Sequence, residues 1–132
     1  TGDFGIWIAN GNVIAKNNIS MASGGKDIEE GGGPTEEYNM TSDATATGTG
    51  AQASKTTADQ FVSVTAGSED LHIKSGSDAI DNGVDLGTTG NSNIDINGRD
   101  RDAQGDTWDI GAHEFVADAD TTGAAFMIFV DS

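Results

Sequence analysis

Short apolar runs separated by Asn- and Gly-rich corners fill the start of the chain. Residues 4–8 alternate Phe or Ile with other side chains, and this period of two predicts a strand with one buried face. The corner at 10–12 is Asn-Gly-Asn, which marks a turn. Two further apolar triplets follow at 13–15 and 19–21. The pattern therefore predicts several very short strands rather than one long hairpin.

Triplet strands with polar corners predict an all-β fold of the β-solenoid type, in which each coil buries a few inward side chains and turns on Asn or Gly. We expect residues 1–74 to form such coils, with 41–59, which is poor in large apolar residues, as an irregular loop excursion. Residues 75–117 are expected to form a loop-rich C-terminal capping module. Residues 118–132 are expected to form a spacer and an apolar terminal strand.

The net charge of this chain of 132 residues is −16, from 22 acidic and 6 basic residues. Such a field repels phosphate backbones and anionic lipid headgroups, so nucleic acid and membrane surfaces are not expected partners. A saline habitat explains the acidity without any specific site. The absence of cysteine excludes disulfides, thiolate zinc sites and thiol catalysis. No apolar run approaches the roughly 20 residues that a membrane-spanning helix needs, so we expect no membrane insertion.

Three stretches in the second half occur in the order typical of one family. They are Leu-His-Ile-Lys-Ser-Gly-Ser-Asp-Ala-Ile-Asp-Asn-Gly at 71–83, Asp-Ile-Asn-Gly-Arg at 95–99 and Asp-Ile-Gly-Ala-His-Glu-Phe at 109–115. Together they resemble the C-terminal module of secreted right-handed parallel β-helix proteins of the choice-of-anchor Q type. The pattern of that module includes D-x-D-G-x-x-R followed by D-I-G-A-Y-E. The chain departs from the module at Asp78, where Pro is usual, and at His113, where Tyr is usual.

The resemblance implies that the chain contains the terminal coils of a right-handed parallel β-helix and works outside the cell, at a cell surface or in a virion. It implies no single activity, because β-helices host lyases, adhesins and phage spikes alike. The opening residues 1–4 are already patterned and include no initiator Met, which indicates a piece of a longer protein.

An Arg within the second stretch is a candidate loop clamp. The planar fork of Arg99 suits a bidentate pair with a carboxylate, and Asp81, Asp95 and Asp109 are the candidate partners. We therefore predict a structural role for these four residues.

An acidic loop after that Arg resembles the first half of a calcium-binding loop. Oxygen-bearing side chains occur at alternate positions, namely Asp100, Asp102, Gln104 and Asp106. A complete loop needs a bidentate Glu at its twelfth position, and Gly111 stands there. Ca²⁺ is thus the one candidate cofactor, and a solvated acidic loop is the alternative.

No pattern for catalysis is visible, so we expect no enzymatic activity from this chain. His72 and His113 are the only histidines, and their spacing gives no argument for a metal pair. Carbohydrate is a candidate ligand because Trp7, Tyr38 and Trp108 offer aromatic rings, although such rings pack in cores more often than they bind.

The most apolar stretch is Ala-Ala-Phe-Met-Ile-Phe-Val at 124–130. Left bare, such a strand is an aggregation hazard, so we expect it either to cover its own module or to contact another copy. The second alternative predicts a homo-oligomer or filament whose contact residues are Phe126, Met127, Ile128, Phe129 and Val130. The chain is thus predicted to be a structural or adhesive module. The alternatives are the non-catalytic C-terminal part of a polysaccharide-acting β-helix enzyme and a calcium-dependent binding module.

Overall fold

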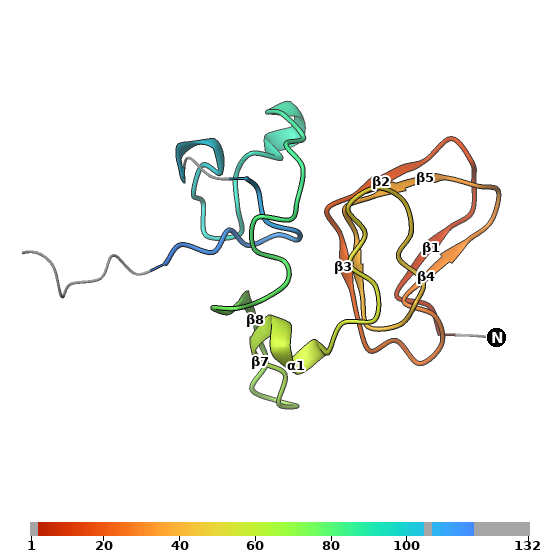
Figure 1. The fold of residues 1–132 in the computed structure, drawn as a ribbon, viewed down its shortest axis with the longest axis horizontal. Coiled ribbons are helices and arrows are strands. Elements are labelled where there is room, and N and C mark those ends of the chain that lie inside the picture. The colour runs from red at the N-terminus through yellow and green to blue at the C-terminus, as the bar shows by residue number, and fades with distance from the viewer. Residues whose placement is uncertain (1–2, 105–106, 118–132) are drawn as a thin grey trace, which may run out of the picture.

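The computed structural model describes residues 3–104 and 107–117, and very short strands make up most of its regular structure (Figure 1). Within these ranges the strands are β1 (Ile6–Ile8), β2 (Ile14–Lys16), β3 (Ile19–Ser20), β4 (Ile28–Glu30), β5 (Thr35–Glu37), β6 (Met40–Thr41), β7 (Phe61–Ser63) and β8 (Asp70–Ile73). A short helix, α1 (Thr57–Gln60), precedes β7. Two 3-10 helices, η1 (Thr89–Asn91) and η2 (Asp102–Gln104), lie in the C-terminal loops.

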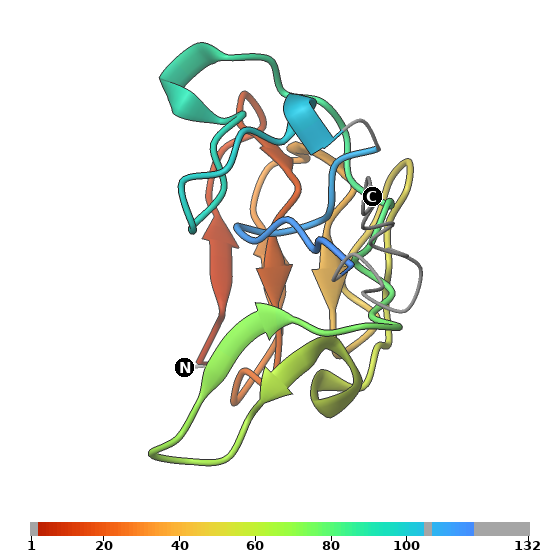
Figure 2. The same ribbon diagram turned by 90° about the vertical axis from the view of Figure 1, so that its left-hand side faces the viewer.

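The first six strands belong to two passes of the chain that lie side by side. Strand β1 pairs with β4, β2 with β5 and β3 with β6, and every pair is parallel. In register, Ile6 lies beside Ile28 and Ile19 beside Met40. Figure 2 shows hairpin β7–β8, which is antiparallel, lying across one end of these strands.

The prediction of a right-handed parallel β-helix is wrong for the described residues. Their strands form separate two-stranded sheets, and no closed solenoid results. A third pass begins with one parallel bridge between Met40 and Gln52, but it extends no further. The chain then enters α1 and the antiparallel hairpin, whose strand directions cannot continue a parallel stack. The structure is thus all-β in character without being a β-helix.

The predicted loop excursion at 41–59 packs closely against the two passes. Between Thr41 and α1 it has no strand of its own, but Ala46 is buried and the backbone N–H of Thr41 donates to Gln52 O at 3.0 Å. The carboxylate of Asp27 accepts hydrogen bonds from the N–H of Ser42 at 2.6 Å and the N–H of Asp43 at 3.1 Å. Side chains that bond backbone donors therefore hold this segment in place of strand pairing.

The core joins the strand pairs to the C-terminal loops. Its buried members are Met40, Phe61, Ile73, Ala79 and Ile110, and the side chains of Ile19, Met21, Ile80 and Phe115 pack against them. These residues come from the strand pairs, the hairpin and the region of the predicted capping module. No helix among the described residues is long and apolar enough to cross a membrane.

Candidate functional site

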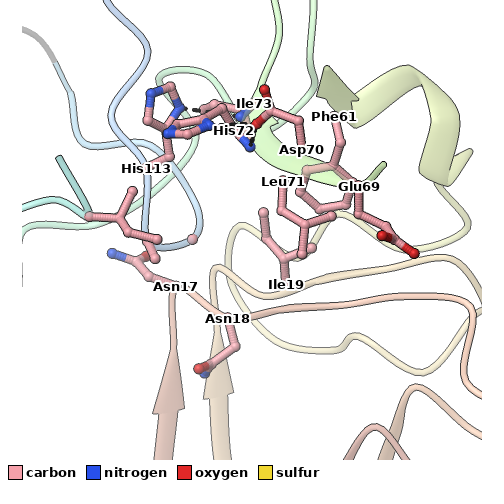
Figure 3. A pocket seen from close by; sticks show the side chains of 13 residues that line it. Asn17, Asn18, Ile19, Phe61, Glu69, Asp70, Leu71, His72, Ile73 and His113 are labelled. Carbon is pink, nitrogen blue, oxygen red and sulfur yellow. Dashed lines mark hydrogen bonds and ion pairs between the residues drawn. The ribbon is translucent and has the colours of Figure 1, made fainter. Parts of the chain in front are cut away.

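A cavity of about 630 Å³ opens where the corner after β2, hairpin β7–β8 and the loop at 111–113 meet (Figure 3). Its walls are mainly apolar and are formed by the side chains of Ile19, Phe61, Leu71, Ile73 and Ile96. Cavities of this size with apolar walls and few polar groups are the usual form of a binding site.

Strand β8 supplies part of the apolar wall of this cavity and also polar side chains beside it. Ile73 is buried at 2% exposure, where it pairs with Phe61 across the hairpin, whereas Leu71 remains 62% exposed at the cavity. A register irregularity between Phe61 and Ser63 breaks the simple alternation of the strand. Together with Ile96, which is 68% exposed at the same cavity, Leu71 leaves a small apolar surface that suits contact with another molecule.

The ring of His72 lies between two acceptors. Its Nδ1 is 2.5 Å from Asp70 Oδ1 and its Nε2 is 3.2 Å from Asn97 Oδ1. The hydrogen bond with Asp70, followed by that with Asn97, raises the pKa of His72 above its ordinary value. Because both ring nitrogens can donate to these oxygens, the arrangement favours the imidazolium form.

The surroundings of the second histidine favour its neutral form. The backbone N–H of Ile73 donates to His113 Nδ1 at 3.2 Å, which assigns the ring proton to Nε2. Burial, and then the charge of the neighbouring His72, lower the pKa of His113. The two rings meet edge to face, with centroids 4.7 Å apart and an interplanar angle of 86°.

In this geometry the histidines already have hydrogen-bond partners. Both nitrogens of His72 are engaged, and His113 uses its only lone pair to accept the Ile73 N–H. Neither ring therefore presents a free basic nitrogen, which a general base requires. His113 offers one N–H donor at Nε2, and the apolar walls offer burial.

A buried Arg forms a second constellation, next to the cavity in the C-terminal loops. The guanidinium of Arg101 donates to Glu114 Oε2 at 2.9 Å and to Gly111 O at 2.7 Å, and its Cζ lies 5.4 Å from the ring centroid of Trp108. Arg101 is 4% exposed and Glu114 is 2% exposed. Burial raises the pKa of Glu114 to about 7, and the attraction of Arg101 only partly opposes this shift. This arrangement clamps the loops of the C-terminal region.

Arg101 therefore has the loop-clamping role that the sequence predicted for Arg99. Arg99 is exposed, and no ion pair of its side chain occurs among the described residues, although its backbone N–H donates to Asp95 Oδ1 at 2.8 Å. The signal that identifies Arg101 is its spacing. Two residues separate it from Gly98, as the D-x-D-G-x-x-R pattern requires.

The three predicted carboxylates differ in what they do. Asp95 is buried and accepts the backbone N–H groups of Asn97, Arg99 and Glu114. Asp109 is buried and accepts the backbone N–H groups of Asp81 and Phe115. Asp81 itself is exposed and contributes that N–H. Asp95 and Asp109 thus bind backbone donors rather than a guanidinium.

The three predicted calcium ligands that the structure describes take part in other hydrogen bonds. Asp102 Oδ1 accepts the indole N–H of Trp108 at 3.0 Å, and Asp100 Oδ1 accepts the backbone N–H of Asp102 at 3.1 Å. The side-chain amide N–H of Gln104 donates to Asp100 O at 3.2 Å, so Gln104 presents a donor to the loop rather than an oxygen ligand. Asp106 lies outside the described residues. Across the part of the chain that the structure describes, no group of three His, Asp or Glu side chains is arranged to hold a metal ion.

Comparison with known proteins gives no match for this chain among family models, curated proteins or solved structures. The resemblance to choice-of-anchor Q proteins therefore stays a prediction.

Two other predicted features fall on different parts of the chain. The two tryptophans among the predicted aromatic ligands differ in burial: Trp108 is 3% exposed, whereas Trp7 is 67% exposed. The predicted oligomer contact at 126–130 lies outside the described residues.

Proposed function

We propose that this chain is a structural or adhesive module of an extracellular or virion protein, without catalytic activity of its own, that associates with further copies. The cavity beside His72 and His113 is the acceptor, and the apolar segment 124–130 of another copy is its occupant. The observation that carries this proposal is the cavity itself, with Leu71 and Ile96 left 62% and 68% exposed at its wall.

The chemistry of the cavity favours that occupant. Glu69 and Asp70 line it and would repel an acidic partner, whereas the segment 124–130 carries no charged side chain. Burying Leu71 and Ile96 together with Phe or Ile side chains of the segment supplies the hydrophobic free energy that association needs. The chain's net charge of −16 opposes association of two copies, so the apolar contact has to outweigh this repulsion.

The polar groups of the described region support a module without catalysis. Asp27, Asp95 and Asp109 are all buried and bind backbone donors, and Arg101 pairs with Glu114. At the cavity both histidines have their basic nitrogens engaged. These charged side chains are of the types that catalysis uses, but their hydrogen bonds and ion pairs hold loops together.

Sedimentation equilibrium of the full chain over a range of concentrations tests the proposal. We expect a mass that rises with concentration, and we expect Leu71→Ser to weaken association about tenfold or more, because a buried Leu contributes roughly 1.5–3 kcal/mol. Val62→Ser is the matched control, since Val62 is 56% exposed on the same hairpin and does not line the cavity. A monomer at every concentration, or equal weakening by both substitutions, contradicts the proposal.

Adhesion to carbohydrate is the second candidate, and the ring pair at β1 favours it. Trp7 and Phe4 are 67% and 41% exposed, with ring centroids 6.3 Å apart at 44°. Exposed aromatic faces stack on the apolar faces of sugars, and the acidic chain favours neutral ones. A Trp fluorescence change that saturates with a neutral oligosaccharide and disappears in Trp7→Ala would support this candidate. No change in the unsubstituted chain would reject it.

A further inference from the structure

A buried glutamate, Glu36, lies near an exposed one, Glu30, away from the cavity that the histidines line. Glu30 ends β4, and Glu36 is the middle residue of β5, where it lies in register beside Ala15 of β2. The side chain of Glu36 is buried, and the residue is only 5% exposed. A carboxylate so far removed from water needs partners that replace its hydration.

The protein partners present leave one oxygen of Glu36 without a hydrogen bond, whereas Glu30 is exposed to water. The hydroxyl of Thr47 lies 3.4 Å from Glu30 Oε1 and 3.4 Å from Glu36 Oε2, and its single proton can serve only one of them. The second oxygen of the buried side chain, Glu36 Oε1, has no hydrogen-bond partner. A buried oxygen without a protein partner is suited to accept a hydrogen bond from a water or to hold a proton or an ion.

The neighbouring glutamates show what these two lack. On the same strands, Glu29 pairs with Lys26, and Glu37 pairs with Lys16 at 2.6 Å. Among the described residues Glu30 and Glu36 have no cationic partner. Burial, and then the proximity of Glu30, raise the pKa of Glu36 to about 7, so Glu36 titrates near neutral pH.

We propose that the carboxylates of Glu30 and Glu36, together with the hydroxyl of Thr47, bind a hard divalent cation of the Ca²⁺ class. All three donors are oxygens, which such cations prefer, and the unpaired Glu36 Oε1 supplies a ligand that no protein group uses. The cation takes the place of the proton that the two carboxylates otherwise share.

The ligand number sets the strength and the pH dependence of this site. Two carboxylates and one hydroxyl leave much of the coordination sphere to water, so the dissociation constant falls in the range of about 10⁻⁴–10⁻³ M that extracellular modules show. Because the cation competes with a proton, binding strengthens as the pH rises through the pKa of Glu36. The calcium loop predicted at 100–106 is not involved.

Thermal unfolding of the full chain at pH 8, after removal of metals, tests the site. We expect CaCl₂ at about 10 mM to raise the Tm by about 5 °C beyond the effect of NaCl at equal ionic strength. The substitutions Glu36→Gln and Glu30→Gln should each abolish the increase. Glu37→Gln is the matched control, since Glu37 already pairs with Lys16, and it should keep the increase.

The Tm of Glu36→Gln without calcium also shows whether this variant folds. The substitution removes an unpaired buried charge, so at pH 8 without calcium we expect its Tm to equal or exceed that of the unsubstituted chain. If calcium raises the Tm no more than NaCl does, the proposal is overturned, and Glu30 and Glu36 share only a proton. An effect that persists in Glu36→Gln overturns it as well, because the ion then binds elsewhere on the acidic surface.

Discussion

Arg101 and Glu114 form a buried ion pair, with Nη1 of the guanidinium 2.9 Å from Oε2 of the carboxylate. The same guanidinium binds Gly111 O and lies against Trp108, so one side chain joins three parts of the C-terminal loops. In a region whose regular structure within the described residues is limited to 3-10 turns, this clamp takes the place of strand pairing. It also holds Gly111 where the cavity begins.

Replacing the clamp should therefore be costly. At pH 8, where Glu114 is mostly ionised, Arg101→Met leaves this carboxylate buried without its partner, and we expect the substitution to lower the free energy of unfolding by about 3–5 kcal/mol. Arg99→Met should change it by no more than about 0.5 kcal/mol, because Arg99 is exposed. Urea denaturation of both variants measures the difference. Equal losses would show that Arg101 is not the clamp.

The pH dependence of stability should reflect two buried glutamates. In the folded state the pKa values of Glu36 and Glu114 are about 7, above their ordinary 4.5. Their stabilising contribution is therefore complete below about pH 4.5 and is lost as the pH rises through 7. We expect the Tm, measured with a chelator present, to fall between pH 5 and pH 8. The fall should be smaller in Glu36→Gln, and a Tm that rises over this interval would contradict the assignment.

At lower pH the opposite effect should appear. Burial tends to raise the pKa of Asp27, but hydrogen bonds from Ser42, Ser23 and Asp43 lower it below its ordinary 3.8. Its contribution is therefore present above that value and is lost as the pH falls through the lowered pKa. Asp27→Ala leaves several of those donors without an acceptor, and we expect a loss of roughly 3 kcal/mol at pH 5 by urea denaturation. The exposed Asp59→Ala is the control, and a loss as large in it would remove the special role of Asp27.

The two histidines should titrate apart. NMR titration of the ring protons is expected to give His72 a pKa above its ordinary 6.5 and His113 a pKa below it. Asp70→Asn removes the carboxylate that holds His72 Nδ1, so the pKa of His72 should decrease. If the two rings titrate together near 6.5, the hydrogen bonds that define the cavity rim are not formed in solution.

The sequence pattern predicted the individual strands better than it predicted how they assemble into a fold. The triplets around Ile6, Ile14 and Ile19 are strands, because period-two alternation and Asn-Gly corners act locally. Their continuation into a β-helix was wrong, since the path of the chain after Gln52 depends on contacts between residues far apart in the sequence. The short helix at Thr57–Gln60 and the turn of hairpin β7–β8 had no strong local signal.

The residues of the candidate site also fall into two groups: those that a local motif indicates and those that only the folded chain brings together. The motif placed Asp95 and Asp109 in a structural role, and both are buried acceptors of backbone N–H groups. The pairing of His72 with His113 could not be predicted, because 40 residues separate His113 from its donor Ile73 and only the folded chain brings them together. The unpaired oxygen of Glu36 was equally hidden, since no local pattern marks one glutamate of an exposed-looking acidic run as buried.

The cavity is proposed to receive an apolar segment of another copy, and dilution tests this contact most directly. NMR spectra of the full chain are recorded while it is diluted from about 1 mM to about 10 μM, because such weak contacts dissociate over this range. We predict that signals of Leu71, His72 and Ile73 shift progressively with dilution, whereas that of Val62 stays in place. Signals at the cavity that are unchanged by dilution would contradict the proposed association.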